Sequence, residues 1–219
     1  ASGQTVTVDY ASSNGTATKG ADYTITSGTL SFAAGETTKT FTVPVLADST
    51  DESNETVTMT LSNASNASIS IATGTLTITD DDSAPSLSIN DVTTTDESAA
   101  NATFTVTLSA ASGQTVTVDY ASSNGTATAG ADYTTARGTL TFSAGETTKT
   151  FTVPVLADTT DESNETVTLT LSNASNASIS DATGTLTITD DDSAPSLSIN
   201  DVTTTDESAA NATFTATLS

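Results

Sequence analysis

The sequence predicts an all-β protein made of tandem two-layered β-sandwiches, and three observations support this fold class. Apolar and polar residues alternate in short runs such as TVTVDY at residues 5–10, which is the period of a half-buried strand. Turn sequences such as SSNGT and AAGET separate these runs, and no stretch has the period of a helix. The whole pattern repeats after 110 residues, which is the length of one sandwich domain.

The two copies of the repeat are nearly identical. The segment ASGQTVTVDYASSNGTAT begins at Ala1 and again at Ala111, and residues 1–109 differ from residues 111–219 at only ten positions. This near identity indicates recent duplication within a longer array. The period is longer than the 20–50 residues, roughly, of solenoid repeats, so each repeat is expected to fold as a separate unit.

Seven strands are expected in each period, and together they favour an immunoglobulin-like Greek-key sandwich. Pro44 lies inside one of the alternating runs. Because proline cannot donate a hydrogen bond to a ladder, that run is expected at a sheet edge or at a bulge. In the first period the expected strands are residues 5–10, 29–32, 40–45, 56–61, 75–79, 86–90 and 103–108.

A polar linker followed by proline, in SAPSLSIND, marks the entry to a unit. With this frame, residues 83–192 form a complete sandwich, residues 1–82 form a repeat that lacks its first strand region, and residues 193–219 are the first strand region of a following repeat. Two interpretations stay open. Either the chain is a window on a longer array, or the C-terminal strand region of one chain completes the open unit of another and builds a head-to-tail filament.

The charge of the chain excludes several partners. The 27 acidic residues against four basic ones give a net charge of −23. Nucleic acid needs clustered Lys and Arg, and an anionic membrane surface attracts basic segments, so neither is expected as a partner. The sequence has no Cys and no His, which removes disulfides, thiolate metal sites and the commonest general base. The acidic surface favours either bound cations or high solubility.

The expected location is extracellular, at a cell surface. No segment approaches the roughly 20 apolar residues that span a bilayer, so no direct membrane insertion is expected. The first residues lack the regions of a signal peptide, so an export signal and an anchor are expected outside this chain.

The acidic residues gather where strands begin or end. In the complete unit they occur in TDES (95–98), GADY (130–133), LADTTDESNE (156–165) and TDDD (189–192). Alternate loops of a Greek-key sandwich meet at the same end, where converging carboxylates raise one another's pKa. Calcium accepts about six to eight oxygen ligands and needs neither His nor Cys. The pattern therefore predicts bound Ca²⁺.

The segment from GTATAGADY to GTLTITDDD (residues 125–192) resembles the Calx-beta domain, known from sodium–calcium exchangers and from large bacterial surface proteins. The resemblance covers nearly all of each period. It implies a calcium cluster at one end of the sandwich, built from an early acid, the Asp of the DY pair, the acidic loop and the terminal aspartates. The implied ligands are Glu97, Asp132, Asp158, Asp161, Glu162, Asp190, Asp191 and Asp192 in the complete unit, and Asp22, Asp48, Asp51, Glu52, Asp80, Asp81 and Asp82 in the first unit.

The first unit has no counterpart of Glu97 of its own, so that ligand has to come from a preceding repeat or from another chain. Glu207 is the spare copy near the C-terminus. The acidic loop is less dense than in exchanger domains, which implies one or two ions in each unit. The alternative is that these are solvated acidic loops of a highly soluble protein.

The function expected from these features is structural. Nearly identical tandem copies fit a calcium-stabilised stiff spacer of a bacterial adhesin or matrix protein, whose partners are calcium ions and neighbouring repeats or identical chains, and whose adhesion target the sequence does not name. A calcium-sensing module and a calcium-independent acidic spacer are the alternatives. Catalysis is disfavoured because the same acids recur in each repeat without an aromatic platform. Ice binding by Thr-X-Thr runs is disfavoured because Thr simply suits an exposed strand face.

Overall fold

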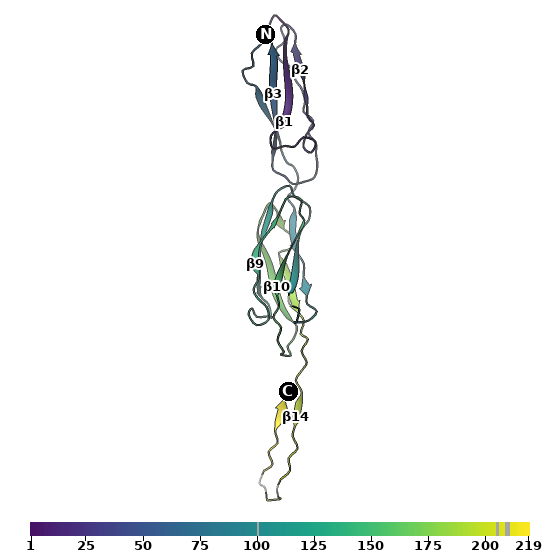
Figure 1. The fold of residues 1–219 in the computed structure, drawn as a ribbon, viewed down its shortest axis with the longest axis vertical. Helices are drawn as coiled ribbons and strands as arrows, with labels where there is room; N and C mark the ends of the chain where they lie inside the picture. Colours follow the sequence, from purple (N-terminus) through teal and green to yellow (C-terminus); the bar gives the residue numbers. More distant parts are fainter. Residues whose placement is uncertain (100, 205, 209–210) are drawn as a thin grey trace.

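The computed structural model describes residues 1–99, 101–204, 206–208 and 211–219. Among these residues there are 15 strands, and no helix is long and apolar enough to cross a membrane. The chain is elongated: residues 1–82 lie at one end, a second sandwich lies in the middle, and a hairpin lies at the other end (Figure 1).

Residues 1–82, called the first unit below, form one antiparallel sheet in the order β2-β1-β3-β4. Its central strands are β1 (Val6–Asn14) and β3 (Glu55–Ser65), flanked by β2 (Ser27–Phe32) and β4 (Thr73–Ile78). Val, Leu and Ile alternate with Thr along these strands, and β-branched Thr suits the exposed side of a pleated sheet.

Residues 83–192, called the complete unit, form two sheets. The smaller sheet has the order β10-β7-β5-β12, and the larger has the order β6-β13-β11-β8-β9. The sequential strands β5 and β6 belong to different sheets, so the chain crosses between the layers at Asn90 and Asp91. The strand bounds are β5 (Ser86–Ile89), β6 (Val92–Thr93), β7 (Asn101–Leu108), β8 (Val116–Asn124), β9 (Arg137–Phe142), β10 (Thr148–Pro154), β11 (Glu165–Ser175), β12 (Ser178–Ile179) and β13 (Thr183–Ile188).

Two short parallel pairs complete this sandwich, β12 with β5 and β6 with β13. The two-residue strands β6 and β12 are additions to the seven strands expected from alternation. The architecture is an all-β, immunoglobulin-like sandwich, which confirms the predicted fold class. The partition of the chain at residues 82 and 192 stays a prediction.

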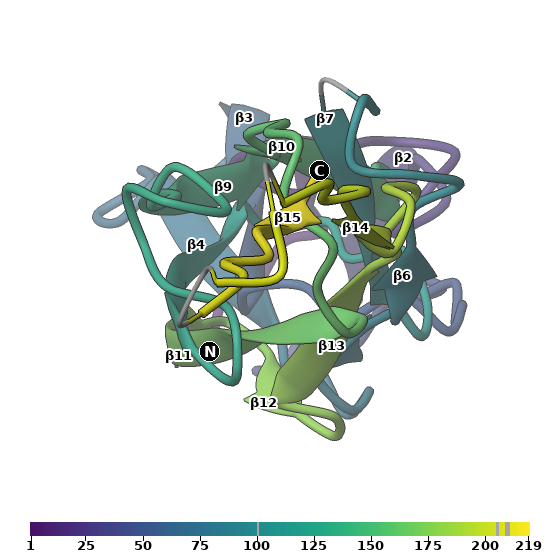
Figure 2. The same ribbon diagram turned by 90° about the horizontal axis from the view of Figure 1, so that it is seen from below.

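The C-terminal segment contains a two-stranded hairpin of β14 (Leu197–Ile199) and β15 (Ala216–Leu218). This hairpin continues along the long axis beyond the sandwich (Figure 1), so in the view along that axis it overlaps the sandwich (Figure 2). Its large apolar side chains are exposed, including Leu197 at 78 % and Phe214 at 56 %.

The two units differ in their cores. The complete unit buries 20 apolar residues in one cluster, among them Phe104, Phe142 and Tyr133. The corresponding cluster of the first unit has three buried members, Ala17, Tyr23 and Val57. A single sheet leaves one apolar face uncovered, so this difference follows from the missing second layer rather than from the residues themselves.

The prediction of a strand at residues 40–45 is wrong. These residues form only an isolated bridge between Tyr23 and Val45, although the same letters at residues 150–155 continue β10. β10 pairs with β7 along its whole length, whereas the described residues place no counterpart of β7 beside residues 40–45. A segment without a partner makes no ladder. β10 itself lies at the edge of its sheet, which its terminal Pro154 permits.

The uncovered face predicts unequal stability within one chain. At low protein concentration we expect the amide of Val57 in β3 to exchange with deuterium at least about tenfold faster than that of Val167 in β11, because local opening exposes less buried surface in the first unit. Hydrogen exchange followed by mass spectrometry measures this ratio. Equal protection of β3 and β11, which differ only by Met59 in place of Leu169, would contradict it.

Candidate metal site

Asp132 lies in the loop that follows β8, and its counterpart Asp22 lies in the loop that follows β1. The N–H of Thr128 donates to Asp132 Oδ2 at 2.6 Å. Next to it, the ring of Tyr133 is fully buried, and its hydroxyl donates to Asn124 Oδ1 at 2.8 Å. The DY pair therefore anchors the loop through the tyrosine and presents the aspartate at the end of the sandwich. The same bonds recur between Thr18 and Asp22 and between Tyr23 and Asn14.

Asp158 and Glu162 belong to the loop that precedes β11. The N–H of Thr160 donates to Asp158 Oδ1 at 2.7 Å, which closes a tight turn around the carboxylate. The N–H of Leu156 donates to the carbonyl oxygen of Asp132 at 2.9 Å, and the N–H of Glu162 donates to Asp190 Oδ1 at 3.2 Å. These bonds hold three separate acidic segments side by side.

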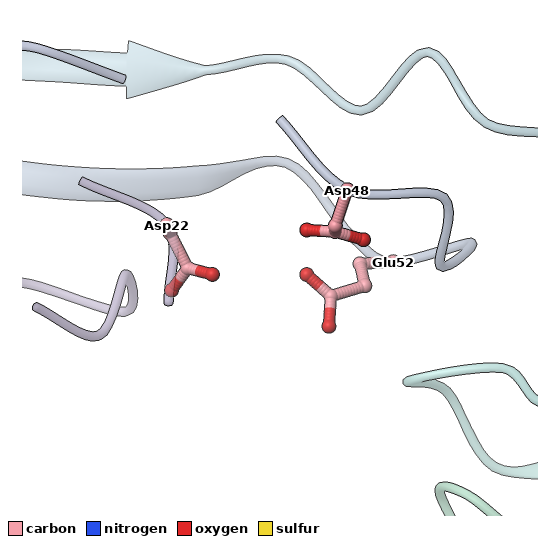
Figure 3. A group of neighbouring side chains, drawn as sticks. All are labelled: Asp22, Asp48 and Glu52. Carbon is pink, nitrogen blue, oxygen red and sulfur yellow. The ribbon is translucent and has the colours of Figure 1, made fainter. Parts of the chain in front are cut away.

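The loops bring carboxylates into three groups, each with oxygen atoms that all lie within 4.8 Å of one another. The first unit has one such group, in which the side chains of Asp22, Asp48 and Glu52 face a common space (Figure 3). The complete unit repeats it with the equivalent residues. The repeated group, called the loop group below, is Asp22, Asp48 and Glu52 in the first unit and Asp132, Asp158 and Glu162 in the complete unit.

A second kind of group, the terminal group, occurs in the complete unit and consists of Glu97, Asp190 and Asp192. Glu97 is buried at 7 % exposure, in the turn between β6 and β7. The N–H of Thr94 donates to the carbonyl of Thr187 at 2.9 Å, and the N–H of Thr189 donates to Thr94 Oγ1 at 3.0 Å. These bonds align the two segments from which the acids project.

The carboxylates of these groups repel one another. Burial raises the pKa of Glu97, and the charges of Asp158 and Asp190 raise it further. Burial and then the charge of Asp158 raise the pKa of Glu162 in the same way. The influence of Asp158 on Glu97 means that the loop group and the terminal group belong to one acidic end of the sandwich. Asp158 itself has a lowered pKa, because the backbone N–H of Thr160 bonds its carboxylate.

Two acids beside the loop groups were missed as ligands by the sequence analysis, Glu55 and Glu165. Burial is the largest cause that raises the pKa of each to about 7, followed by a hydrogen bond with Asp22 or Asp132 respectively. Each glutamate therefore keeps its own proton up to near neutral pH. Glu165 belongs to the acidic run LADTTDESNE, but it is the first residue of β11, and the alternation pattern concealed its approach to the loop.

The structure places the other predicted ligands outside the three groups. Asp51 is buried at 8 % exposure against the complete unit, whereas its counterpart Asp161 is exposed. Asp80 accepts a hydrogen bond from the N–H of Glu52 at 3.2 Å. Among the described residues, no glutamate lies beside Asp80 and Asp82 in the way that Glu97 lies beside Asp190 and Asp192. The remaining three, Asp81, Asp191 and Glu207, are exposed.

No basic side chain of the described residues pairs with these groups. Lys39 binds Glu36 at 3.0 Å, and Lys149 binds Glu146 at 2.8 Å, but neither glutamate belongs to a group. The negative charge of each group is therefore uncompensated by the protein.

The donor set of each group fits a hard divalent cation. Three carboxylates supply oxygen ligands only, and calcium completes a shell of about six to eight oxygens with carbonyls and water. Transition metals favour imidazole or thiolate, which this chain lacks. The chemistry that the arrangement supports is thus binding of a divalent cation such as calcium.

Comparison with known families identifies the class. The Calx-beta domain model matches residues 1–82 and 80–192. The chain belongs to the Calx-beta domain family, as a tandem of these domains, which confirms the resemblance seen in the sequence. A comparison with curated proteins found no match.

Solved structures of similar chains are also Calx domains. The crystal structure of the apo-form Calx CBD1 domain is 24 % identical, with a TM-score of 0.47, and the match covers 49 % of this chain and 98 % of that one. The crystal structure of CBD12 from CALX1.2 is 23 % identical, with a TM-score of 0.44, and the match covers 85 % of this chain and 88 % of that one.

The raised pKa values of Glu55 and Glu165 predict how the stability of the metal-free chain depends on pH. Glu55 and Glu165 keep their protons up to about pH 7 when folded, whereas an ordinary glutamate releases its proton near 4.5. The folded state then binds more protons than the unfolded state between these values, so stability falls as pH rises from about 5 to about 8. Melting temperatures measured in this range on the metal-free chain test the prediction.

The double variant Glu55→Gln, Glu165→Gln is the control for this profile, and we expect a flatter dependence on pH from it. A melting temperature of the unmodified metal-free chain that is constant or rises across this range would contradict the prediction.

Proposed function

We propose that this protein is a calcium-stabilised structural rod: a stiff spacer of a bacterial surface adhesin or matrix protein, in which calcium at the acidic ends fixes each sandwich. The observation that carries the proposal is the convergence of Asp132, Asp158 and Glu162 within 4.8 Å, repeated in both units without a basic partner among the described residues. Cation binding would relieve the repulsion that raises the pKa values at these sites.

The joint between the units supports a role in stiffness. Ser112 Oγ donates to Asp51 Oδ2 at 2.8 Å, and the N–H of Gly113 donates to the carbonyl oxygen of Asp51 at 2.9 Å. Asp51 lies between Asp48 and Glu52 in the sequence, and both of these belong to the loop group. An ion held by Asp48 and Glu52 would therefore fix the loop through which the first unit contacts the complete unit.

The organisation of the chain favours a spacer over a sensor. The repeats are nearly identical and follow one another along an extended axis, so each added copy makes the protein longer (Figure 1). An extracellular location agrees with this function, since calcium modules outside cells bind at about 10⁻⁴ to 10⁻³ M, where calcium is abundant.

Calcium is expected to stabilise the chain against heat. In 10 mM CaCl₂ we expect the melting temperature of the complete unit to be roughly 5–10 °C higher than in chelator, because the ion binds only the folded state. The variant Asp158→Asn should lose most of this shift, whereas Asp181→Asn, which removes the same charge from an exposed residue outside the groups, should retain it. No shift in the unmodified chain would defeat the proposal.

Calcium is also expected to stiffen the joint. The chain has no cysteine, so Ser62→Cys and Ser172→Cys place single spin labels on exposed positions of β3 and β11. We expect the distribution of distances between the labels to narrow in calcium and to broaden in chelator. Asp48→Asn should keep the distribution broad in calcium. Equal widths in both buffers would contradict a role of calcium in stiffness.

A further inference from the structure

A load along the chain enters the complete unit at its first strands and leaves it after its last strand. The first unit joins this sandwich at one end of its long axis, and the residues that follow the sandwich leave at the other end (Figure 1). Within the unit, β5 and β6 come first and β13 comes last. The contacts between these strands therefore decide what happens when the two ends of the unit are pulled apart.

The entry strand β6 and the exit strand β13 lie side by side and run in the same direction. β6 is the edge strand of the larger sheet, and it pairs with β13 through Val92 opposite Leu186 and Thr93 opposite Thr187. A pull on the start of β6 and on the end of β13 slides the two parallel strands past each other. All the bonds between them are then loaded together, whereas an antiparallel hairpin pulled from its open end breaks its bonds one after another.

Residues on both sides of β6 add hydrogen bonds to this short pair. Before it, the N–H of Thr185 donates to Asp91 Oδ1 at 2.7 Å. After it, the N–H of Thr94 donates to the carbonyl oxygen of Thr187 at 2.9 Å. Thr94 and Thr189 bond each other twice: the N–H of Thr189 donates to Thr94 Oγ1 at 3.0 Å, and Thr189 Oγ1 donates to the carbonyl oxygen of Thr94 at 2.9 Å. β6, β13 and these flanking residues are called the entry–exit clamp below.

The clamp is shielded from water. Thr94 is 7 % exposed, and Leu186 and Ile188 of β13 are almost fully buried. A loaded hydrogen bond breaks more readily when water can replace it, so burial raises the cost of separating the strands. A threonine hydroxyl can both donate and accept, and a β-branched side chain suits an extended backbone, so threonine fits both sides of the clamp.

The clamp protects the part of the unit that lies between its two strands in the sequence. Strands β7 to β12 follow β6 and precede β13. A load that crosses directly from β6 to β13 does not reach them. β5 precedes the clamp and is held separately, by β7 and β12 in the smaller sheet. Most of the unit therefore cannot extend until the clamp has opened.

We propose that the complete unit bears tension: the entry–exit clamp holds its first and last strands together in shear, and Thr94 and Thr189 set the force at which the unit unfolds. This function differs from the stiffness proposed above, which concerns bending at the joint between the units. A spacer under load keeps its length only while its units stay folded, and the clamp supplies that resistance.

A cation at the terminal group would strengthen the same clamp. Glu97 follows β6, and Asp190 and Asp192 follow β13, so their carboxylates connect the entry and exit segments just beyond the clamp. An ion between them would carry part of the load from one segment to the other. This part rests on the calcium binding proposed above, whereas the hydrogen bonds of the clamp need no ion.

Pulling the complete unit in two directions tests the clamp. The chain has no Cys, so Ser83→Cys and Ser193→Cys attach handles to the full chain at exposed positions on either side of the unit. Thr117→Cys and Ser143→Cys instead attach them near the open end of the β8–β9 hairpin. In optical tweezers at constant force, which measure the rate of unfolding, we expect the first direction to give a lifetime at least about tenfold longer, because several bonds must break together.

Two variants of the clamp are expected to weaken it in the first direction only. Thr94→Val leaves the N–H of Thr189 without its acceptor, and Thr189→Val removes the other bond of the pair. Each should shorten the lifetime at constant force about tenfold in the first direction and leave the second direction unchanged. Melting curves of both variants establish that the unit is folded before it is pulled.

Thr126→Val is the matched control for these variants. Thr126 Oγ1 also accepts a backbone N–H, from Thr166 at 2.8 Å, but this bond lies away from the entry and exit strands. The control should leave the lifetime in the first direction nearly unchanged. Equal lifetimes of the unmodified unit in the two directions, or equal effects of Thr126→Val and the two clamp variants in the first direction, would overturn the proposal.

Repeating the first direction in calcium and in chelator separates the clamp from the ion. We expect calcium to lengthen the lifetime of the unmodified unit, and Glu97→Gln to remove this gain. A chain that melts at a higher temperature in calcium but gains no lifetime under load would overturn the role of the terminal group in bearing tension. If calcium changes neither quantity, the calcium binding is overturned, whereas the difference between the two directions in chelator still supports the clamp.

Discussion

Carboxylates that converge at the end of a sandwich repel one another when no positive partner neutralises them. In this protein the loop group repeats in both units, within 4.8 Å and with no basic residue of the described chain to neutralise it. The raised pKa of about 7 at Glu55 and Glu165 is the local consequence of burial, of a hydrogen bond with Asp22 or Asp132 respectively, and of the neighbouring negative charges. A bound cation would relieve this repulsion.

The repulsion between carboxylates also bears on the contact between the two units. The loop that carries Asp48 and Glu52 also carries Asp51, which is buried against Ser112 of the next unit. Neutralising the charge of that loop would thus act on the stability of one sandwich and on the angle between two. Under the proposed function, a repeat that joins a calcium site to its domain contact would gain stiffness with every copy.

The sequence was sufficient for most of the strands and for the approximate positions of the acidic segments, because alternation and local composition are properties of neighbouring residues. It listed Asp190, Asp191 and Asp192 together, whereas in the structure Asp191 is exposed and only Asp190 and Asp192 belong to the terminal group. The sequence could not predict that Asp51 is buried whereas Asp161 is exposed, because Asp51 is buried by its contact with Ser112, which is distant in the sequence. The strand prediction for residues 40–45 was wrong for the same reason. A strand needs a hydrogen-bonding partner strand, and the sequence of residues 40–45 does not determine whether one lies beside them.

The most direct measurement of the central claim is a crystal structure of this chain grown with calcium near neutral pH. The account predicts a density peak between Asp132, Asp158 and Glu162, at about 2.3–2.6 Å from their oxygens, and an equivalent peak between Asp22, Asp48 and Glu52. Carboxylates separated by water alone, with no ion at either loop group in saturating calcium, would contradict it.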